Sequence, residues 1–503
     1  MTTAVAVCDS CTKARYRPAQ RADELLRPLL PAMVPWLAGR RWFAHERGCL
    51  QELRPVTSTV IPLDPSDPDS PVLVHAVMVA RHSTNATHRY QLLLGVRRGL
   101  PERLAPALIG QAVGGEWDGR MVYEATADPE LMSRLLEWTA LGGSDSLRLS
   151  RPDAAPIPLD LPPHPLSVEQ SNTSVVYGDR LMLKLLRRPE PGLHPEVEVL
   201  GALTEVGSTR TTRLLGWLST GDGDGESTVL GILTEFLPAH GSGWDMAVGH
   251  AADCLTGGRR AVPTIGGFTS DALALGEAVA ELHAALAQAF GVTRMAPDEV
   301  DELTDGMQRR LRAAVRAVPE LEPYAGRIAT LYQDFGKVAL RGRGVDGQRI
   351  HGDLHLGQVL SGDAGWKIID FEGEPSKPVA ERGRPEPALR DVAGMLRSFD
   401  YAAQQALGET LRREGGTEQP ADGEPSAARL RRIRRAQAWA VRNRRAFNAG
   451  YAAAGGTDPH CHPVALRAFE ADKAVYEAVY ESQHRPEWLP IPMSAVQRLV
   501  SGR

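Results

Sequence analysis

The sequence lacks long apolar runs and an excess of positive charge, and it has few aromatic residues. No stretch of about 18 apolar residues is present, so we expect no membrane-spanning helix. The formal net charge of -5 gives no basic footprint and disfavours nucleic acid as a partner. The first residues have no basic region ahead of an apolar one, so we expect no secretory signal peptide.

Cysteine is also scarce. Five cysteines in 503 residues are typical of a reducing compartment, which predicts a cytoplasmic protein. Cys8 and Cys11 form a C-x-x-C pair, but a structural zinc site needs four ligands, and no second pair follows at a suitable spacing. We therefore assign no metal to this pair and expect about the first twenty residues to be disordered. We also expect a monomer.

The chain is too long for one ordinary core, and its patterns predict three regions. In residues 1–110, a helix at 22–37 precedes alternating strand-like runs, which predicts an antiparallel sheet. Residues 111–238 contain two strands around the turn Tyr177-Gly178-Asp179, then a helix and a further strand. Residues 239–503 are mostly helical in pattern. The predicted fold class is therefore α/β, with sheets first and helices after them.

Two features interrupt the helical region. Residues 413–427 are polar and rich in glycine and proline, which predicts a loop. The basic run that follows them resembles a nucleic-acid patch, but its spacing places most of the cations on one solvated helical face. We favour the solvated face.

The stretches "HGDLHLGQVL" (351–360) and "WKIIDFEGEP" (366–375) carry the chemical signal. Phosphoryl transfer needs a carboxylate near the attacking hydroxyl, oxygen ligands for Mg²⁺ and a cation for the phosphates. Asp353 lies in a polar loop, where it is a candidate base. Gln358 offers an amide oxygen, and Asp370 ends an apolar strand; both are candidate magnesium ligands. Each residue alone has an ordinary alternative as a turn or cap residue, and their order along the chain favours the functional interpretation.

Lys184 lies in the apolar strand "LMLKLL" and is the candidate phosphate-binding cation. A buried lysine needs a partner, although it can also extend its ammonium group to solvent. Glu198 on the following helix is the predicted partner. Glu196 is the alternative, because the register of the helix is uncertain from the sequence.

The nucleotide-binding segment lacks the glycine-rich loop of protein kinases. In its place stands "EQSNTSVVYGD", where backbone N–H groups and hydroxyls could cover the phosphates; an ordinary polar turn is an equal alternative. The hydroxyl candidates are Ser171, Thr173 and Ser174. Resemblance to the protein-kinase fold, in which adenine bonds to the backbone of the connector, would place the adenine at Glu235, Phe236 and Leu237.

The helix "ALRAFEADKAVYEAVYE" predicts the acceptor side. Its period places five side chains on one stripe: Glu470, Lys473, Tyr476, Glu477 and Tyr480. Charged groups and aromatic faces suit a sugar. The stripe could equally be a solvated face of ion pairs worth a few tenths of a kcal/mol each. We add His351 to the substrate candidates.

The order "LMLKLL … TEFLP … HGDLHLGQVL … IIDFEGEP" resembles the eukaryotic-like small-molecule kinases, including aminoglycoside and choline phosphotransferases. Those usually carry Asn where this chain has Gln358. Over almost its whole length, including "RRWFA" (40–44) and "FEADKAVYEAVYESQHRPEWLPIP", the chain more closely resembles the actinobacterial maltokinases. The resemblance implies a bilobal protein-kinase-like fold with an N-terminal cap subdomain in 1–110. Residues 111–238 would complete the nucleotide-binding lobe, and 239–503 would form a helical lobe with the catalytic, metal and sugar sites.

The resemblance also implies ATP-dependent phosphorylation of maltose to maltose 1-phosphate for α-glucan and glycogen synthesis. It makes Asp353 the base and Lys184 the phosphate-binding lysine, and it makes Gln358 and Asp370 the magnesium ligands, with Glu372 assisting. Trehalose synthase or another enzyme of α-glucan synthesis is a candidate partner.

Three alternatives to a maltokinase remain. A related glucosamine kinase would favour additional carboxylates near Asp353. A catalytically silent kinase-like module is disfavoured because the base, the lysine and the metal ligands are all present. A protein kinase is disfavoured because no A-P-E-type segment follows Asp370.

Overall fold

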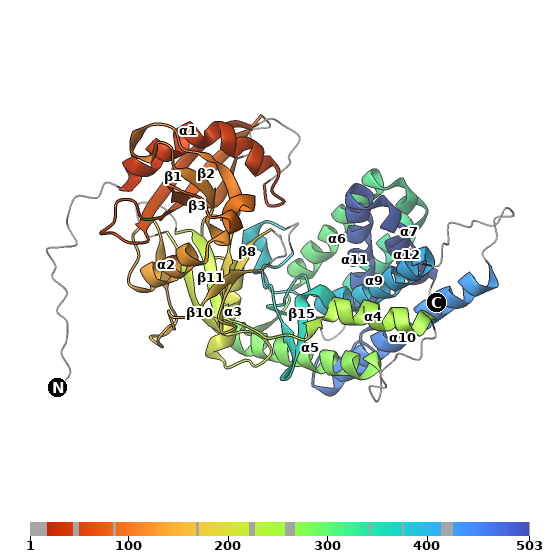
Figure 1. The fold of residues 1–503 in the computed structure, drawn as a ribbon. Helices are drawn as coiled ribbons and strands as arrows, with labels where there is room; N and C mark the ends of the chain where they lie inside the picture. The colour runs from red at the N-terminus through yellow and green to blue at the C-terminus, as the bar shows by residue number, and fades with distance from the viewer. Residues whose placement is uncertain are drawn as a thin grey trace. The chain divides into compact units, whose positions relative to one another are not determined.

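A computed structural model of the chain describes residues 18–43, 50–83, 87–166, 171–220, 227–256, 267–341, 344–374, 377–413 and 426–501 (Figure 1). Residues 1–17 of the predicted disordered start, the Cys8/Cys11 pair and most of the predicted 413–427 loop lie outside these ranges, whereas residues 18–20 begin a helix. The chain divides into two compact units. The N-terminal unit comprises residues 1–197 and 214–237, and the C-terminal unit comprises 198–213 and 238–503.

A five-stranded antiparallel sheet in the order β1-β2-β3-β5-β4 begins the N-terminal unit. Its elements are α1 (Pro18–Ala38), β1 (Leu50–Pro62), β2 (Val72–His82), β3 (Thr87–Arg97), η1 (Glu102–Ala107), β4 (Leu108–Gln111), η2 (Gly115–Trp117) and β5 (Met121–Glu124). The predicted boundary at 110/111 falls within β4, and β5 pairs with β3. The first sheet is therefore complete only at Glu124, later than predicted.

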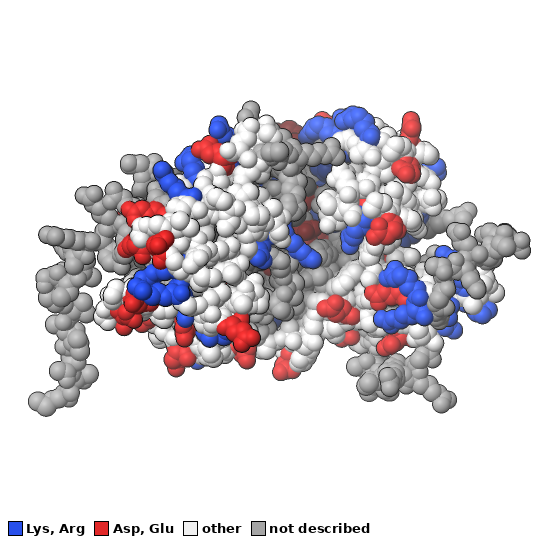
Figure 2. All heavy atoms as spheres, turned by 45° about the horizontal axis from the view of Figure 1, so that its top comes forward, with Lys and Arg blue, Asp and Glu red and all other residues white. Residues whose placement is uncertain are grey.

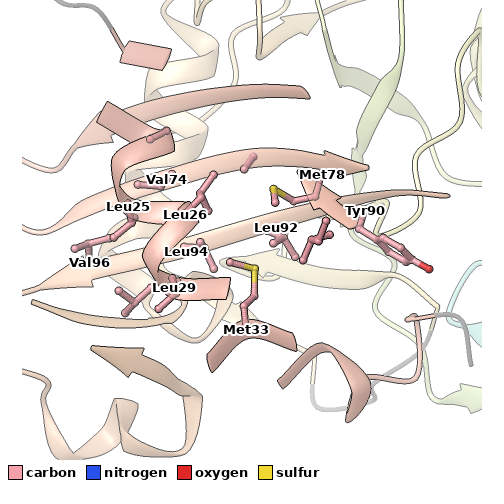
Figure 3. Close-up of a cluster of buried hydrophobic side chains, with 14 of the residues drawn as sticks. Leu25, Leu26, Leu29, Met33, Val74, Met78, Tyr90, Leu92, Leu94 and Val96 are labelled. Carbon is pink, nitrogen blue, oxygen red and sulfur yellow. The ribbon is translucent and has the colours of Figure 1, made fainter. Parts of the chain in front are cut away.

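Side chains of α1 cover one face of this sheet (Figure 3). Successive residues of a strand point to opposite faces, and both faces of β2 are buried. Val74 and Met78 pack under α1, whereas Leu73 and Val77 pack into a second core. This second core includes the hairpin residue Leu183, so the first sheet lies between α1 and the following sheet of the same unit.

The second sheet has the order β6-β10-β11-β9-β8-β7. Its elements are η3 (Ala125–Ala127), α2 (Pro129–Ala140), β6 (Arg148–Ser150), β7 (Pro163–Pro165), β8 (Thr173–Tyr177), β9 (Leu181–Leu185), β10 (Leu214–Ser219) and β11 (Val229–Glu235). The predicted hairpin is confirmed as β8 and β9. Its turn places Gly178 and Asp179 at φ values of 51°, a left-handed conformation that glycine and aspartate tolerate better than most residues. The unit boundary after Val197 falls within the next helix, α3 (Pro195–Glu205).

The C-terminal unit is mostly helical, as predicted. Its helices are α4 (Gly243–Thr256), α5 (Phe268–Phe290), α6 (Pro297–Ala317), η4 (Pro319–Leu321), α7 (Glu322–Arg341), η5 (Leu356–Gln358), α8 (Val379–Arg382), α9 (Leu389–Arg413), α10 (Ala427–Ala453), α11 (Pro463–His484), η6 (Pro486–Trp488) and α12 (Pro490–Ser501). Its strands are β12 (Gly241–Ser242), β13 (Val292–Arg294), β14 (Asp346–Gln348), β15 (Val359–Gly362) and β16 (Gly365–Ile368). Helix α5 packs closely on α10. The approach requires glycine at Gly276 and Gly450, because a Cβ atom at either position would collide with backbone of the opposite helix.

Charge on the surface is mixed. Figure 2 shows Lys and Arg side chains interspersed with Asp and Glu side chains over the face that it displays. Among the described residues, no helix is both long and apolar enough to cross a bilayer.

Candidate active site

The loop that starts the "HGD" stretch is fixed by a buried carboxylate of α9. The backbone N–H groups of His351 and Gly352 donate to the two oxygens of Asp391, at 2.7 and 2.9 Å. His283 of α5 donates through Nε2 to Asp391 at 3.0 Å, and its Nδ1 lies 2.8 Å from the hydroxyl of Tyr451 on α10. Three helices therefore hold the backbone that carries Asp353.

The environment of Asp391 keeps it ionised. Burial favours the neutral acid, but the hydrogen bonds from His283 and Gly352 outweigh burial and hold the pKa of Asp391 below its ordinary value.

Asp391→Asn should therefore turn an amide N–H toward one of the donors that now bond to a carboxylate. We expect the free energy of unfolding to fall by about 1–3 kcal/mol. Urea titration of the purified variant measures this, and an unchanged midpoint would contradict the role of Asp391.

Asp353 forms an ion pair across the C-terminal unit. Its Oδ1 lies 2.9 Å from Nζ of Lys473 on α11, and both side chains are about three-quarters buried. Burial would raise the pKa of Asp353, yet the positive charge of Lys473 holds it below its ordinary value. Asp353 therefore stays an ionised hydrogen-bond acceptor near neutral pH.

The two predicted magnesium ligands in this unit lie side by side. Gln358 donates through Nε2 to Asp370 at 2.9 Å, and the hairpin of β15 and β16 brings them together. Asp370 has a φ of 69°, an uncommon left-handed conformation of the kind that concentrates at functional sites. Carboxylate oxygens of Asp370 and Glu372 lie within 4.8 Å of each other. Mg²⁺ prefers oxygen ligands such as carboxylate and amide oxygens, so Gln358, Asp370 and Glu372 fit that ion.

In the N-terminal unit, Lys184 is held by Glu196. The distance from Nζ to the carboxylate is 2.7 Å, and both side chains are largely buried. The first prediction, Glu198, is wrong, and the alternative is confirmed. Residues two apart on a helix face different directions, and Glu198 instead pairs with Arg349 at 2.9 Å.

The predicted phosphate-covering residues differ in their surroundings. Ser174 lies directly opposite Lys184 in the β8–β9 ladder, so both side chains share one face of the sheet. The hydroxyl of Thr173 accepts a hydrogen bond from Arg187. Ser171 lies exposed just before β8. A role for these three hydroxyls at the phosphates stays a prediction.

The connector keeps its predicted position at the end of β11. Glu235 pairs with Leu181, and the N–H of Phe236 donates to Arg180 at 2.9 Å. Leu237 is the last residue of the N-terminal unit. Adenine binding by this backbone stays a prediction.

The predicted acceptor stripe on α11 does not form one surface. Lys473 and Tyr476 line a pocket with Asp353. The carboxylates of Glu470 and Glu477 are buried and pair with Arg444 and Arg397. Tyr480 is 41% exposed and stacks on a neighbouring histidine of α11. The five-residue sugar platform is therefore wrong as predicted.

The alternative interpretation of the stripe as a solvated face is also wrong. Glu470 lies 2.8 Å from Arg444, and Glu477 lies 2.7 Å from Arg397, whose side chain is 1% exposed. The sequence did not indicate that α11 packs against α9, the helix that supplies Arg397.

One narrow pocket is lined by the Asp353 loop, and a larger one adjoins that pocket. The narrow one, of about 30 Å³, is lined by Asp353, Lys473 and Tyr476, together with Glu374 and Asp472. The larger one, of about 490 Å³, shares two arginines, Arg310 and Arg390, with the narrow pocket. His351 is 2% exposed and lines neither pocket, and its Nε2 bonds to the carbonyl of Ile369 at 2.9 Å, so it supports the loop. A contact of His351 with the substrate stays a prediction.

Several residues of this region were missed. They all lie on helices: Asp391, Asp472, Arg310 and Arg390. A charged residue at a helix position where the pattern expects an apolar one was the sequence signal that could have identified them. Asp472 is 5% exposed and pairs with Arg310 at 2.6 Å and Arg390 at 3.3 Å. Such pairs depend on contacts between distant helices, which the local pattern does not reveal.

A lysine held by a helical glutamate, an aspartate loop and a second aspartate after a hairpin define a protein-kinase-like phosphotransferase fold. Residues 163–430, more than half of the chain, match the phosphotransferase enzyme family. Residues 36–128 match the maltokinase N-terminal cap domain. The chain belongs to the phosphotransferase enzyme family and carries a cap of the maltokinase type.

Two relatives of the chain are glucosamine kinases. The chain is 29% identical over 348 residues to the glucosamine kinase of Streptacidiphilus jiangxiensis, covering 67% of this chain and 73% of the relative. It is 28% identical over 352 residues to that of Mycolicibacterium smegmatis (strain ATCC 700084 / mc(2)155), covering 67% and 79%. A solved glucosamine kinase in complex with glucosamine, ADP and inorganic phosphate is similar with a TM-score of 0.61 at 22% identity, over 90% of this chain and 96% of that chain. This likeness confirms the predicted fold class.

Proposed function

We propose that the protein transfers the γ-phosphoryl group of ATP to a hydroxyl of a sugar, with Asp353 as the general base. The observation that carries the proposal is the ionised, largely buried Asp353, paired with Lys473 at the edge of a polar pocket. The loop that presents it is fixed by Asp391, so its position is set before any substrate arrives.

The residues divide the work of phosphoryl transfer. One oxygen of Asp353 is engaged by Lys473, and the other accepts the proton of the attacking hydroxyl. Lys184, oriented by Glu196, binds the inner phosphates. Gln358, Asp370 and Glu372 would hold Mg²⁺, which when bound neutralises charge on the phosphates.

We further propose an amino sugar, with glucosamine as the first candidate, as the acceptor. An ammonium group is recognised by carboxylates, and Glu374 and Asp472 line the same narrow pocket as Asp353. Asp472 already pairs with two arginines, Arg310 at 2.6 Å and Arg390 at 3.3 Å. We therefore assign the ammonium group to Glu374, the other of these two carboxylates that line the pocket with Asp353. The names of the two relatives support this choice.

Maltose is the second candidate. The match of residues 36–128 to the maltokinase cap favours it, and the larger pocket of about 490 Å³ next to the narrow one offers room for sugar rings. The product would then be maltose 1-phosphate for α-glucan synthesis, and trehalose synthase would remain the candidate partner. A cytoplasmic location suits either candidate.

A sugar panel tests the acceptor. With ATP and Mg²⁺, we expect glucosamine to exceed glucose by about 10- to 100-fold in kcat/KM, because a charge-assisted hydrogen bond contributes about 1.5–3 kcal/mol. N-acetylglucosamine, which lacks the ammonium charge, should react no better than glucose. The phosphorylated sugars are measured by mass spectrometry, together with release of ADP. A higher kcat/KM for maltose would favour the second candidate, and no phosphorylated sugar at all would contradict the proposed function.

Two variants sharpen this test. Glu374→Gln should lower the preference for glucosamine over glucose toward one, because the amide lacks the negative charge. Glu281→Gln is the matched control, since Glu281 pairs with Arg210 and lines neither pocket. The control should keep the preference of the unmodified enzyme.

A further inference from the structure

A buried arginine connects the first sheet to the hairpin that carries Lys184. Arg187 follows β9, and its side chain is only 2% exposed. Its Nε donates to the hydroxyl of Thr173 on β8 at 2.8 Å, and its Nη2 donates to Glu124 of β5 at 2.9 Å. Its guanidinium carbon also lies 5.2 Å from the ring centre of Trp42, at a distance typical of a cation–π contact. Its Nη1 donates to the carbonyl of Gln91 on β3 at 3.4 Å, so each nitrogen of the guanidinium group bonds to a different strand.

A second buried group joins the same strands. The N–H of Gln91 on β3 donates to the carbonyl of Arg187 at 3.0 Å. The side-chain amide of Gln91 donates to the carbonyls of Leu186 and Leu230, at 3.1 and 2.8 Å. Its amide oxygen accepts from His75, whose pKa burial lowers to about 4, so the ring is neutral and donates through Nε2. The ends of β9 and β11 are thus attached to the first sheet.

These contacts lie next to the predicted phosphate-binding face. Thr173 opposes Leu185 and Ser174 opposes Lys184 in the β8–β9 ladder. A hydrogen bond that fixes Thr173 therefore fixes the backbone one residue from Ser174, at the start of β8. The sequence before β8 lacks the glycine-rich loop of protein kinases, so ordering of β8 itself has to come from other contacts.

We propose that Arg187 is a positioning residue through which the N-terminal cap holds the nucleotide-binding hairpin. Arg187 does not contact the nucleotide; it holds Thr173, with Glu124 and Trp42 as its anchors in the cap. The cap then serves nucleotide affinity by reducing the ordering that binding would otherwise require. This inference rests on the proposed use of ATP.

The test measures nucleotide binding directly. Arg187→Lys keeps the positive charge but loses the planar fork that bonds to Thr173 and Glu124 together. We expect the Kd for ADP with Mg²⁺, measured by calorimetry on the full chain, to rise about 10-fold, as for loss of a charge-assisted hydrogen bond. The KM for the sugar should stay within about twofold, because its pocket belongs to the C-terminal unit.

A matched variant separates positioning from general loosening of the cap. Arg97 of β3 bonds to Tyr123, Asp128 and Glu130, all within the cap and the start of α2. Arg97→Lys should lower the Tm by an amount comparable to Arg187→Lys while the Kd for ADP stays unchanged. Equal increases in Kd for both variants would overturn the inference.

A double-mutant cycle tests the route through Thr173. Thr173→Val removes the hydroxyl that accepts from Arg187, and Thr173→Ser keeps it. If Arg187 acts through Thr173, the effects of Thr173→Val and Arg187→Lys on the Kd are not additive, and Thr173→Ser raises the Kd less than Thr173→Val does. Additive effects, or an unchanged Kd for Arg187→Lys, would overturn the inference and leave the proposed function intact. Failure of the unmodified protein to bind ADP would overturn both.

Discussion

Replacing Asp353 with Asn is expected to lower kcat by about 10²–10⁴-fold, the usual contribution of a positioned general base. Asn has the same shape and can still accept a hydrogen bond from Lys473, but it has no capacity for the proton of the attacking hydroxyl. The Kd for ADP should change little, because Asp353 acts on the acceptor. The measurement is initial rate at saturating ATP and sugar, with calorimetry for ADP.

The fold should survive this substitution. The loop backbone is held by Asp391 through His351 and Gly352, and the side chain of Asp353 takes no part in those bonds. The control is therefore a far-ultraviolet circular dichroism spectrum, which should match that of the unmodified protein. More than about a third of the original kcat in the variant would rule out Asp353 as the base.

The pH profile offers an independent check on the same residue. A depressed pKa means that the Asp353–Lys473 pair contributes stability above the unfolded value, about 3.9 for aspartate. That contribution is lost as pH falls through the lower folded value. Asp353 therefore stays ionised from about pH 5 upward. An acid limb in kcat/KM that lies above pH 5 and disappears in Asp353→Asn would contradict this ionisation state.

The sequence pattern predicts the elements that depend on neighbouring residues, such as hairpins and loops. The β8–β9 hairpin follows from alternating apolar residues around Gly178 and Asp179, and the structure forms it. The aspartate loop and the carboxylate after the "WKII" strand also lie where the pattern placed them. These elements need only a few neighbouring residues, so the sequence contains the information that determines them.

Contacts between distant helices are where prediction failed. Lys473 lies 120 positions from Asp353, yet their side chains are 2.9 Å apart. The period of α11 identified its stripe but not which neighbours it meets, so Glu470 and Glu477 were assigned to a sugar when they pair with arginines. The choice of Glu198 over Glu196 was an error of helical phase, because the two residues face different directions.

Asp370→Asn is expected to raise the Mg²⁺ concentration needed for half-maximal activity by about 100-fold or more. Loss of a residue that only hydrogen-bonds to a metal ligand already costs about 10- to 100-fold in metal affinity, and Asp370 is itself the proposed ligand. An amide oxygen carries no formal charge, so it competes less well with water for a hard cation. The rate at saturating Mg²⁺ should fall as well, since the ion neutralises charge that develops on the phosphates.

Asn is the right replacement because of the backbone. Asp370 has a φ of 69°, and asparagine tolerates this left-handed region better than alanine does. The substitution therefore changes the ligand without adding the strain that Asp370→Ala would introduce. Asp363→Asn is the matched control: it lies in the turn of the same β15–β16 hairpin, and its side chain is 97% exposed.

The two variants are compared by titrating Mg²⁺ at fixed ATP and sugar, and by measuring ADP binding with and without Mg²⁺. In the unmodified protein and in Asp363→Asn, Mg²⁺ should strengthen ADP binding. In Asp370→Asn that strengthening should largely disappear, while metal-free ADP binding stays the same. If Asp370→Asn kept the original Mg²⁺ requirement, the carboxylate after β16 would not be a metal ligand, and its unusual backbone conformation would need another explanation.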